Sequence, residues 1–359
     1  MFGIDKDKLI RRAKILSKLG SAIVKAKLLK ERKPIFVGLY ITNLCNLRCK
    51  YCFVNIDDRF NEPSRAGFNK DEVIKIVDEL YEMGTRWIFL LGGEPLMHKD
   101  IGPIVRHITK KGILLHILTN GTLIKQKIDE IDTADSVCIS IDGAEDSTDK
   151  MRGQGTFKRA LSGVETALSR GMLVRVHAVL NKHSLTEMDA LVEMAKEMKI
   201  TITISPPNYL GKSDDPALAL TTDEYKEFYL RYRKLKEKGY PIGNSFYSID
   251  KSLHWPISYH NYITTEQKFA HYKPIPCVIG YTHGCIDAEG TMFNCIQRGC
   301  LDGLNIKEVG IKRAWDALPE RRADCVSCSS INTIETSAYL NLIPDIMLDG
   351  FRFFLGQRK

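Results

Sequence analysis

Apolar runs of β type alternate with amphipathic stretches of helical period over the first 205 or so residues of the 359-residue chain. The first run, PIFVGLYIT at 34–42, predicts a buried strand. Further strands are predicted at 86–91, 113–119, 136–141, 173–179 and 200–205. Helical patterns lie between them, near 70–83, 101–111, 122–131, 156–170 and 184–198. The pattern predicts a βα unit repeated six times.

Strands that are apolar on both faces and joined by helices predict a parallel sheet, either doubly wound or curled into a barrel. The positions of the chemically distinctive residues favour the barrel, because each group directly follows a predicted strand. In strand order these are three cysteines, Gly92-Gly93-Glu94-Pro95, Thr119-Asn120-Gly121, Asp142 and Asn181. In a (β/α) barrel such positions share the rim on which active sites are built.

The pattern breaks after about Pro206, where Pro-, Tyr- and His-rich stretches contain one clear helix at 222–238. A cysteine-rich segment and an apolar, helical tail follow. The predicted organisation is a basic N-terminal helix (1–33), a barrel (34–215), a linker with helical parts (216–276), a cysteine-rich domain (277–330) and the tail (331–359).

The net charge of +8 is carried by the N-terminal segment, since residues 1–33 hold eleven Lys/Arg and three acidic residues. The rest of the chain is therefore neutral, which argues against a nucleic-acid partner. No apolar run approaches the roughly 18 residues of a membrane span, and the start lacks the features of a signal peptide. We expect a cytoplasmic protein.

Cysteines at 45, 49 and 52 form a CxxxCxxC group, and six of the ten cysteines lie between Cys277 and Cys328. Such clustering favours metal binding over disulfides. Three thiolates from one loop leave one iron of a [4Fe–4S] cubane open, and the methionine part of S-adenosylmethionine (SAM) can chelate that iron. The alternatives are a zinc site or buried thiols.

Four short motifs together resemble the radical SAM superfamily over about residues 36–205. They are CxxxCxYC at 45–52, Gly92-Gly93-Glu94-Pro95, Ser140-Ile-Asp142-Gly143 and Arg152-Gly153. The resemblance implies a partial (β/α)6 TIM-like barrel, a [4Fe–4S] cluster held by Cys45, Cys49 and Cys52, bound SAM, and an electron donor such as flavodoxin or ferredoxin.

The resemblance also implies which residues contact SAM. The glycine-rich motif matches the segment that binds the SAM amino group, and Asn120, Ser140 and Asp142 match positions near its ribose and carboxylate. A turn cap at Ser140 or Asp142 and a solvated charge at Arg152 are the ordinary alternatives. The expected contacts are Tyr51, Gly92, Gly93, Glu94, Pro95, Asn120, Ser140, Asp142 and Arg152.

The second cysteine group resembles the auxiliary-cluster extensions called SPASM and, in shorter form, Twitch. It implies one auxiliary [4Fe–4S] cluster on Cys277, Cys295, Cys325 and Cys328. A structural zinc site is the alternative. The stretch 285–295 predicts a β-hairpin.

Three cysteines remain outside these two groups. Cys285 or Cys300 is a substitute ligand for Cys277, and Cys300 is a candidate hydrogen-atom donor to a product radical. For both, a buried thiol is the ordinary interpretation. Cys138, on a predicted strand, is expected in the core.

The basic N-terminal segment has two interpretations. Leu16, Leu19, Ile23 and Ala26 recur at helical spacing, with Lys14, Lys18, Lys25 and Lys27 mostly beside them. This pattern is typical of an interfacial helix on an anionic membrane surface, which would make the protein peripheral on the inner face of the membrane. The alternative is a helix packed on the barrel with a solvated basic face.

The resemblance implies that SAM is cleaved reductively to a 5′-deoxyadenosyl radical, which abstracts a hydrogen atom from a substrate. A membrane lipid or other hydrophobic substrate fits an interfacial helix, because unactivated C–H bonds demand a radical. The alternatives are a peptide-modifying maturase and a dehydrogenase of small metabolites. A non-catalytic zinc-binding protein is an explanation of a different class.

Overall fold

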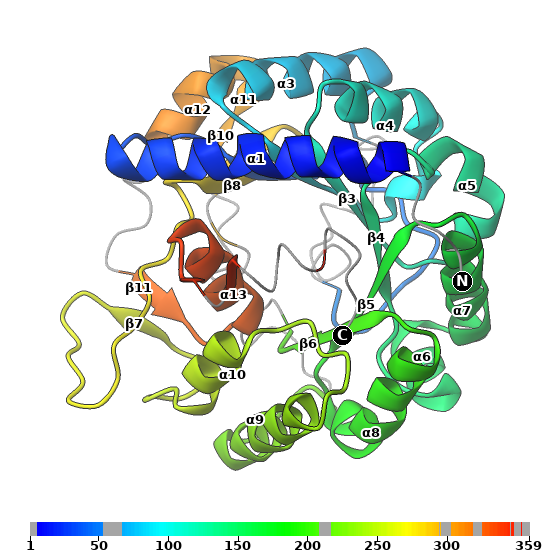
Figure 1. Ribbon diagram of the computed structural model, residues 1–359, viewed down its shortest axis with the longest axis vertical. Coiled ribbons are helices and arrows are strands. Elements are labelled where there is room, and N and C mark those ends of the chain that lie inside the picture. Colours follow the sequence, from blue (N-terminus) through cyan, green and yellow to red (C-terminus); the bar gives the residue numbers. More distant parts are fainter. Residues whose placement is uncertain are drawn as a thin grey trace.

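The computed structural model describes residues 6–52, 67–207, 217–293, 295, 303–318, 325–344, 346–347 and 353. Six strands pair in chain order, each parallel to the next (Figure 1). They are β1 (Phe36–Tyr40), β2 (Trp87–Leu91), β3 (Leu114–Thr119), β4 (Ser136–Ser140), β5 (Leu173–Val179) and β6 (Thr201–Ser205). Because the order never reverses, the sheet is singly wound, and the predicted partial (β/α)6 barrel is confirmed.

Helices cover the outer face of this sheet. They are α3 (Lys70–Met83), α4 (Ile101–Lys110), α5 (Ile124–Ile131), α6 (Glu145–Arg152), α7 (Thr156–Ser169) and α8 (Lys182–Glu197). Local sequence fixes their ends: α3 begins at a capping box between Asn69 and Glu72 and ends at Gly84, whose φ of 111° suits glycine. The short, polar α6 was not predicted.

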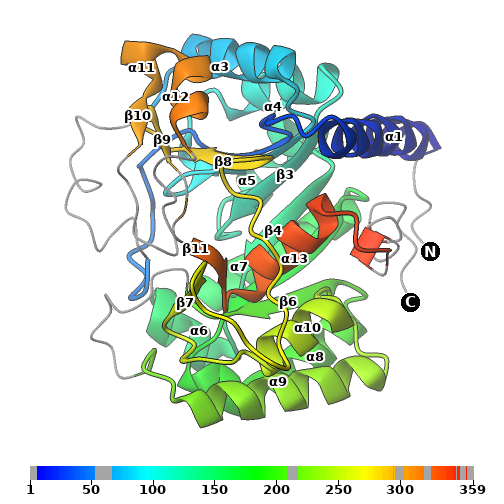
Figure 2. The same ribbon diagram turned by 90° about the vertical axis from the view of Figure 1, so that its left-hand side faces the viewer.

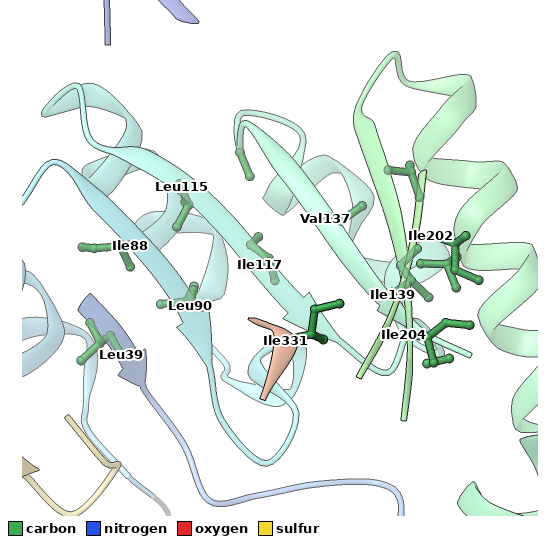
Figure 3. Packing of buried hydrophobic residues seen from close by; sticks show 14 of the residues in the cluster. Leu39, Ile88, Leu90, Leu115, Ile117, Val137, Ile139, Ile202, Ile204 and Ile331 are labelled. Carbon is green, nitrogen blue, oxygen red and sulfur yellow. The ribbon is translucent and has the colours of Figure 1, made fainter. Parts of the chain in front are cut away.

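The outward-facing side chains of the strands form the main core with these helices (Figure 3). Leu39, Ile88 and Ile117 are fully buried there. Burial of each such side chain stabilises the fold by about 1.5–3 kcal/mol. The inward-facing positions hold aromatic and polar residues instead, so the two faces of the sheet differ in character.

The cysteine-rich segment adds strands to the same sheet. β8 (His283–Ile286) pairs parallel with β1, and β9 (Thr291–Phe293) and β10 (Leu304–Asn305) follow in antiparallel pairing. The predicted hairpin is thereby confirmed. Two short helices, α11 (Ile306–Val309) and α12 (Ile311–Ala317), come next.

The remaining elements lie at the open side of the barrel, between β8 and β6 (Figure 1). They are α9 (Thr222–Glu237), α10 (Phe246–Leu253), a two-stranded sheet of β7 (Tyr262–Thr264) and β11 (Cys325–Cys328), and α13 (Ile331–Leu340). Glu335 on α13 accepts hydrogen bonds from Ser245 N (3.1 Å) and Ser245 Oγ (2.7 Å) at the start of α10. This contact holds α13 in place across the opening.

The basic helix α1 (Lys6–Leu28) lies at the opposite end of the barrel from the loop that follows β1 (Figure 2). Its apolar stripe packs on Phe36 and Leu114, near the starts of β1 and β3. The stripe that suggested membrane binding consists of Leu16, Leu19, Ile23 and Ala26, all buried. The helix cannot present this stripe to a lipid surface, so the alternative of a helix packed on the barrel describes the structure.

Two arginines also fix α1 to the barrel. Arg11 pairs with Asp135 at 2.5 Å, and Arg12 Nη2 donates to Asp135 O at 3.0 Å. The four lysines beside the stripe, Lys14, Lys18, Lys25 and Lys27, are exposed. Among the described helices, none combines the length and apolarity of a membrane span.

Candidate active site

The loop after β1 carries the first cysteine group at the rim of the barrel. Cys45, Cys49 and Cys52 are half-buried. Burial, together with negative charge on Cys52, raises the pKa of Cys45 to about 11 and that of Cys49 to about 12. The thiols are therefore close enough to repel one another as thiolates. A bound cationic cluster would offset that repulsion, so the donor set fits iron.

The Gly92-Gly93 segment after β2 fastens this loop. Gly93 N donates to Thr42 O and Glu94 N to Leu44 O, both at 2.7 Å. A Cβ atom at Gly92 would lie 2.7 Å from Thr42 O, and one at Gly93 would lie 2.5 Å from Leu44 O. Both positions therefore require glycine. The structure thus gives both glycines a role in the close approach of this segment to the cysteine loop, and their predicted contact with the SAM amino group stays a prediction.

Glu94 joins the ends of β2 and β3. Its buried carboxylate accepts hydrogen bonds from Leu96 N (3.0 Å), Thr119 Oγ1 (2.7 Å) and Asn120 N (2.7 Å). Burial raises the pKa of Glu94 to about 7 in spite of these bonds. The following residue, Pro95, is buried at the start of a 3₁₀ turn.

Asn120 ties the β3 loop to the cysteine loop. Its Nδ2 donates to Asn46 Oδ1 at 2.8 Å, and its Oδ1 accepts from Thr122 N at 3.0 Å. Asn46 in turn donates to Thr122 Oγ1 at 2.9 Å. The amide is thus oriented by protein groups on both sides.

Asp142, Arg152 and Tyr51 form a buried clamp, which we name the Asp142 clamp. Arg152 donates to both Asp142 oxygens, from Nε at 2.8 Å and from Nη2 at 2.9 Å. Tyr51 OH donates to Asp142 Oδ2 at 2.5 Å, and Val179 N donates to Oδ1 at 3.0 Å. Four donors therefore saturate the carboxylate, and Tyr51 links it to the cysteine loop.

The structure pairs Asp142 with Arg152, and the predicted SAM contacts of both residues stay predictions. Arg152 also lies 5.3 Å from the Tyr51 ring. Ser140 ends β4, half-buried and in register with His177. Asn181 caps α8, accepting from His183 N (2.9 Å) and Ser184 N (3.1 Å). The rim is a continuous hydrogen-bonded frame around the cysteine loop.

Residues 39–195, which include this whole frame, match the model of the Radical SAM superfamily. The chain carries a radical SAM domain. Domains of this superfamily bind SAM at a [4Fe–4S] cluster, and the three thiols of the cysteine loop lie within the matched residues.

Two curated proteins illustrate the range of relatives. Fe-coproporphyrin III synthase of Methanosarcina barkeri is 31% identical over 223 residues, which are 59% of this chain and 55% of the synthase. The chain thus spans about half the length of that relative. An S-adenosylmethionine-dependent nucleotide dehydratase of Flammeovirga pacifica is 24% identical over 231 residues, 60% of this chain and 79% of the dehydratase.

A solved structure extends the likeness beyond the domain. SuiB of Streptococcus suis, bound to its precursor peptide SuiA, has a TM-score of 0.63 at 18% identity. The match covers 83% of this chain and 68% of SuiB. At that identity the likeness establishes a shared fold, which includes elements outside the radical SAM domain.

The second cysteine group lies on three segments of the chain. Cys325 and Cys328 lie at the two ends of β11, and Cys277 N donates to Val326 O on that strand at 2.9 Å. Burial raises the pKa of Cys328 well above its ordinary value, and negative charge on Cys295 and Cys277 raises it further. The thiols of Cys277, Cys295 and Cys328 therefore share one neighbourhood. They are distant from the cysteine loop in sequence.

Two of the remaining cysteines face the interior of the barrel. Cys285 on β8 is buried, and its Sγ lies 3.7 Å from His283 Nε2. Cys138, on β4, is half-buried. The candidate hydrogen donor Cys300 lies outside the described residues.

A cavity of about 930 Å³ fills the interior of the radical SAM barrel. Phe36, Trp87 and Phe89 line it on one side, and Arg175 and His177 line it from β5. The cavity reaches the cofactor rim at Tyr40, whose pKa is raised well above its ordinary value by burial and also by Cys285 and Cys52. Its size lies within the roughly 300–1,000 Å³ typical of small-molecule sites.

None of the sequence motifs includes these cavity residues. One signal was present, because His116, Arg175 and His177 interrupt otherwise apolar strands at inward-facing positions. Polar residues inside a buried parallel strand require a partner or a ligand. The sequence alone does not show that these residues line one cavity, because that depends on how the sheet curves.

Proposed function

We propose that the protein is a radical SAM enzyme that abstracts a hydrogen atom from a substrate bound in the barrel cavity. The observation that carries the proposal is the placement of Cys45, Cys49 and Cys52 in one loop. That loop is fixed to the Gly92-Gly93 segment at the rim, and the cavity reaches the same rim at Tyr40.

When bound, the reduced [4Fe–4S] cluster supplies the electron that breaks a carbon–sulfur bond of SAM and yields a 5′-deoxyadenosyl radical. The chain's own groups provide the setting for this chemistry. The Gly92-Gly93 segment and the Asp142 clamp hold the cysteine loop from two sides. The buried Glu94 places a carboxyl beside the loop, suited to the cationic ammonium of SAM.

We further propose one auxiliary [4Fe–4S] cluster on Cys277, Cys295, Cys325 and Cys328, and an electron donor such as flavodoxin or ferredoxin. The shared neighbourhood of Cys277, Cys295 and Cys328 supports the auxiliary cluster. Transfer of an electron to or from the substrate is a role that such a cluster can supply.

The substrate is proposed to be a small molecule that enters the cavity. The two curated relatives are named for a tetrapyrrole and for nucleotides. The apolar stripe of α1, which suggested a membrane-lipid substrate, is buried in the protein and no longer supports that substrate. A peptide substrate is the second candidate, since the fold matches SuiB.

The test is anaerobic incubation of the reconstituted protein with SAM and dithionite, with 5′-deoxyadenosine and methionine measured together. The wild-type protein should form both, and Cys49→Ala should lower their formation by at least about 1,000-fold. Cys138→Ala is the matched control and should retain wild-type iron content. A protein that binds zinc and forms no 5′-deoxyadenosine would refute the proposal.

A further inference from the structure

The wall of the barrel cavity is built from flat rings. Phe36 stacks on Trp87 at 4.4 Å between ring centroids, and Trp87 meets Phe89 edge-on at 5.5 Å. His283 lies 4.3 Å from Phe36, and Tyr339 of α13 lies 5.7 Å from Trp87. Barrel interiors are ordinarily filled by branched aliphatic side chains. An aromatic wall beside open volume suits a flat conjugated ligand.

Arg175 on β5 is one of the cationic residues that line this cavity. It makes no ion pair with any described residue, and its buried Nε has no hydrogen-bond partner within the described ranges. Its guanidinium lies 4.4 Å from the Phe353 ring. A guanidinium facing an aromatic cavity without a carboxylate partner is a receptor for a carboxylate or phosphate.

The charged residues around the cavity give it a net positive charge, the same sign as that of Arg175. The described lining contains four cationic residues, Arg175, Lys196, Lys199 and Lys236, and two acidic residues, Glu237 and Glu335. The carboxylate of Glu335 is already bound to the start of α10, Glu237 pairs with Arg233, and Lys196 pairs with Glu193, so Arg175, Lys199 and Lys236 carry the positive charge of the lining. The cavity is therefore electropositive and attracts anions.

The three histidines of the lining do not add to this charge at neutral pH. Burial lowers the pKa of His177 and of His283 to about 4, and it lowers that of His116 well below its ordinary value. Nδ1 of His283 is buried without a hydrogen-bond partner among the described groups. His177 is held by Thr203 and Ser205, so His283 is the imidazole that offers a neutral nitrogen to a ligand, while Arg175 supplies the charge.

Resting on the proposed function, we infer that the cavity binds a flat conjugated ring that bears carboxylate or phosphate groups, with Arg175 as the anchor for the acidic group. Two sources share this chemistry, a carboxylated tetrapyrrole and a nucleotide. The aromatic wall recognises the ring in either case, and the cation recognises the acid.

The test is a binding titration of the reconstituted full chain under anaerobic conditions, followed by quenching of tryptophan fluorescence. Coproporphyrin III is the probe for a tetrapyrrole, and GTP and CTP are the probes for a nucleotide. We expect saturable binding of one class at one site per chain. The methyl ester of the porphyrin, or the parent nucleoside, should bind at least about tenfold more weakly.

Arg175→Gln should weaken binding at least about tenfold, and Arg175→Lys should retain part of the affinity because the charge remains. Arg170→Gln is the matched control, since Arg170 lies on the surface, paired with Asp129. Its affinity should equal that of the wild type. Circular dichroism and the Arg175→Lys variant separate loss of binding from loss of folding.

Arg175-dependent binding of coproporphyrin III assigns the tetrapyrrole source, and Arg175-dependent binding of a nucleotide assigns the other. Failure of all probes to bind overturns the inference, as does unchanged affinity in a folded Arg175→Gln variant. The titration needs no SAM cleavage, so its failure is distinguishable from failure of the proposed function, which is measured by 5′-deoxyadenosine formation.

Discussion

The rim and the interior of the barrel arise from the same six strands, yet they differ in how their polar groups are satisfied. At the rim, four donors saturate Asp142 and three donors hold Glu94. In the interior, Arg175 Nε, Trp87 Nε1 and His283 Nδ1 have no hydrogen-bond partner among the described residues. The protein itself completes the frame for the cofactor, whereas the interior leaves donors and acceptors for a ligand.

The largest expected effect is loss of the Asp142 clamp. Asp142→Ala leaves the buried Arg152 without a counter-charge, so the free energy of unfolding should fall by about 3–5 kcal/mol. Iron content after reconstitution should fall as well, because Tyr51 loses its link to the clamp. Anaerobic chemical denaturation and iron analysis measure the two effects.

Asp129→Ala is the control for this variant, because Asp129 pairs with Arg170 at an exposed site. An exposed pair of this kind contributes about 0–1 kcal/mol. Equal stability losses in the two variants would show that the rim is no more tightly built than the surface.

A smaller effect is expected from acid, through the interior histidines. Burial lowers the pKa of His177 and that of His283 to about 4, so the folded protein favours the neutral form of both imidazoles. Their stabilising contribution is present above the ordinary pKa near 6.5 and is lost as pH falls towards 4. Each histidine accounts for up to about 3 kcal/mol of that loss.

Thermal melts between pH 7 and pH 4 measure this dependence. His177→Gln should flatten the decline in melting temperature, and His254→Gln, at an exposed position, should leave the slope unchanged. If His177→Gln shows the wild-type slope, the buried imidazole is not a source of acid sensitivity.

The smallest expected effect is on the stability of Arg175 variants. Arg175 has no ion pair among described residues, so Arg175→Met should leave the free energy of unfolding within about 1 kcal/mol of the wild type or raise it. The same variant should bind the interior ligand poorly. A loss comparable with that of Asp142→Ala would mean that Arg175 serves the fold and would erase the contrast between rim and interior.

The barrel could be predicted from sequence because its strands are apolar on both faces and its helices are amphipathic. The predicted strand at 136–141, for instance, differs from β4 by one residue. The short helix α6 escaped because its eight residues, EDSTDKMR, lack an apolar stripe. The partner of the N-terminal helix could not be predicted, because a helix that binds a membrane and a helix that packs on a barrel have the same spacing of apolar residues such as Leu16 and Leu19.

The site was predictable where a motif follows a strand, as at Gly92 and Glu94. The contacts within the protein were not predictable, because they depend on hydrogen bonding in the folded chain: the Gly92-Gly93 segment approaches the cysteine loop, and Asp142 binds Arg152. The cavity depends on which side chains point inward from curved strands, and one-dimensional spacing does not encode that curvature.

The assignment of the SAM-binding cluster to the cysteine loop is tested most directly by electron paramagnetic resonance of a reduced variant that lacks the second cysteine group. In this variant Cys277, Cys295, Cys325 and Cys328 are all changed to alanine. We expect about four irons per chain and one reduced [4Fe–4S] signal that changes when SAM is added. Loss of the SAM-sensitive signal in this variant, with retention in Cys49→Ala, would contradict the assignment of the SAM-binding cluster to the cysteine loop.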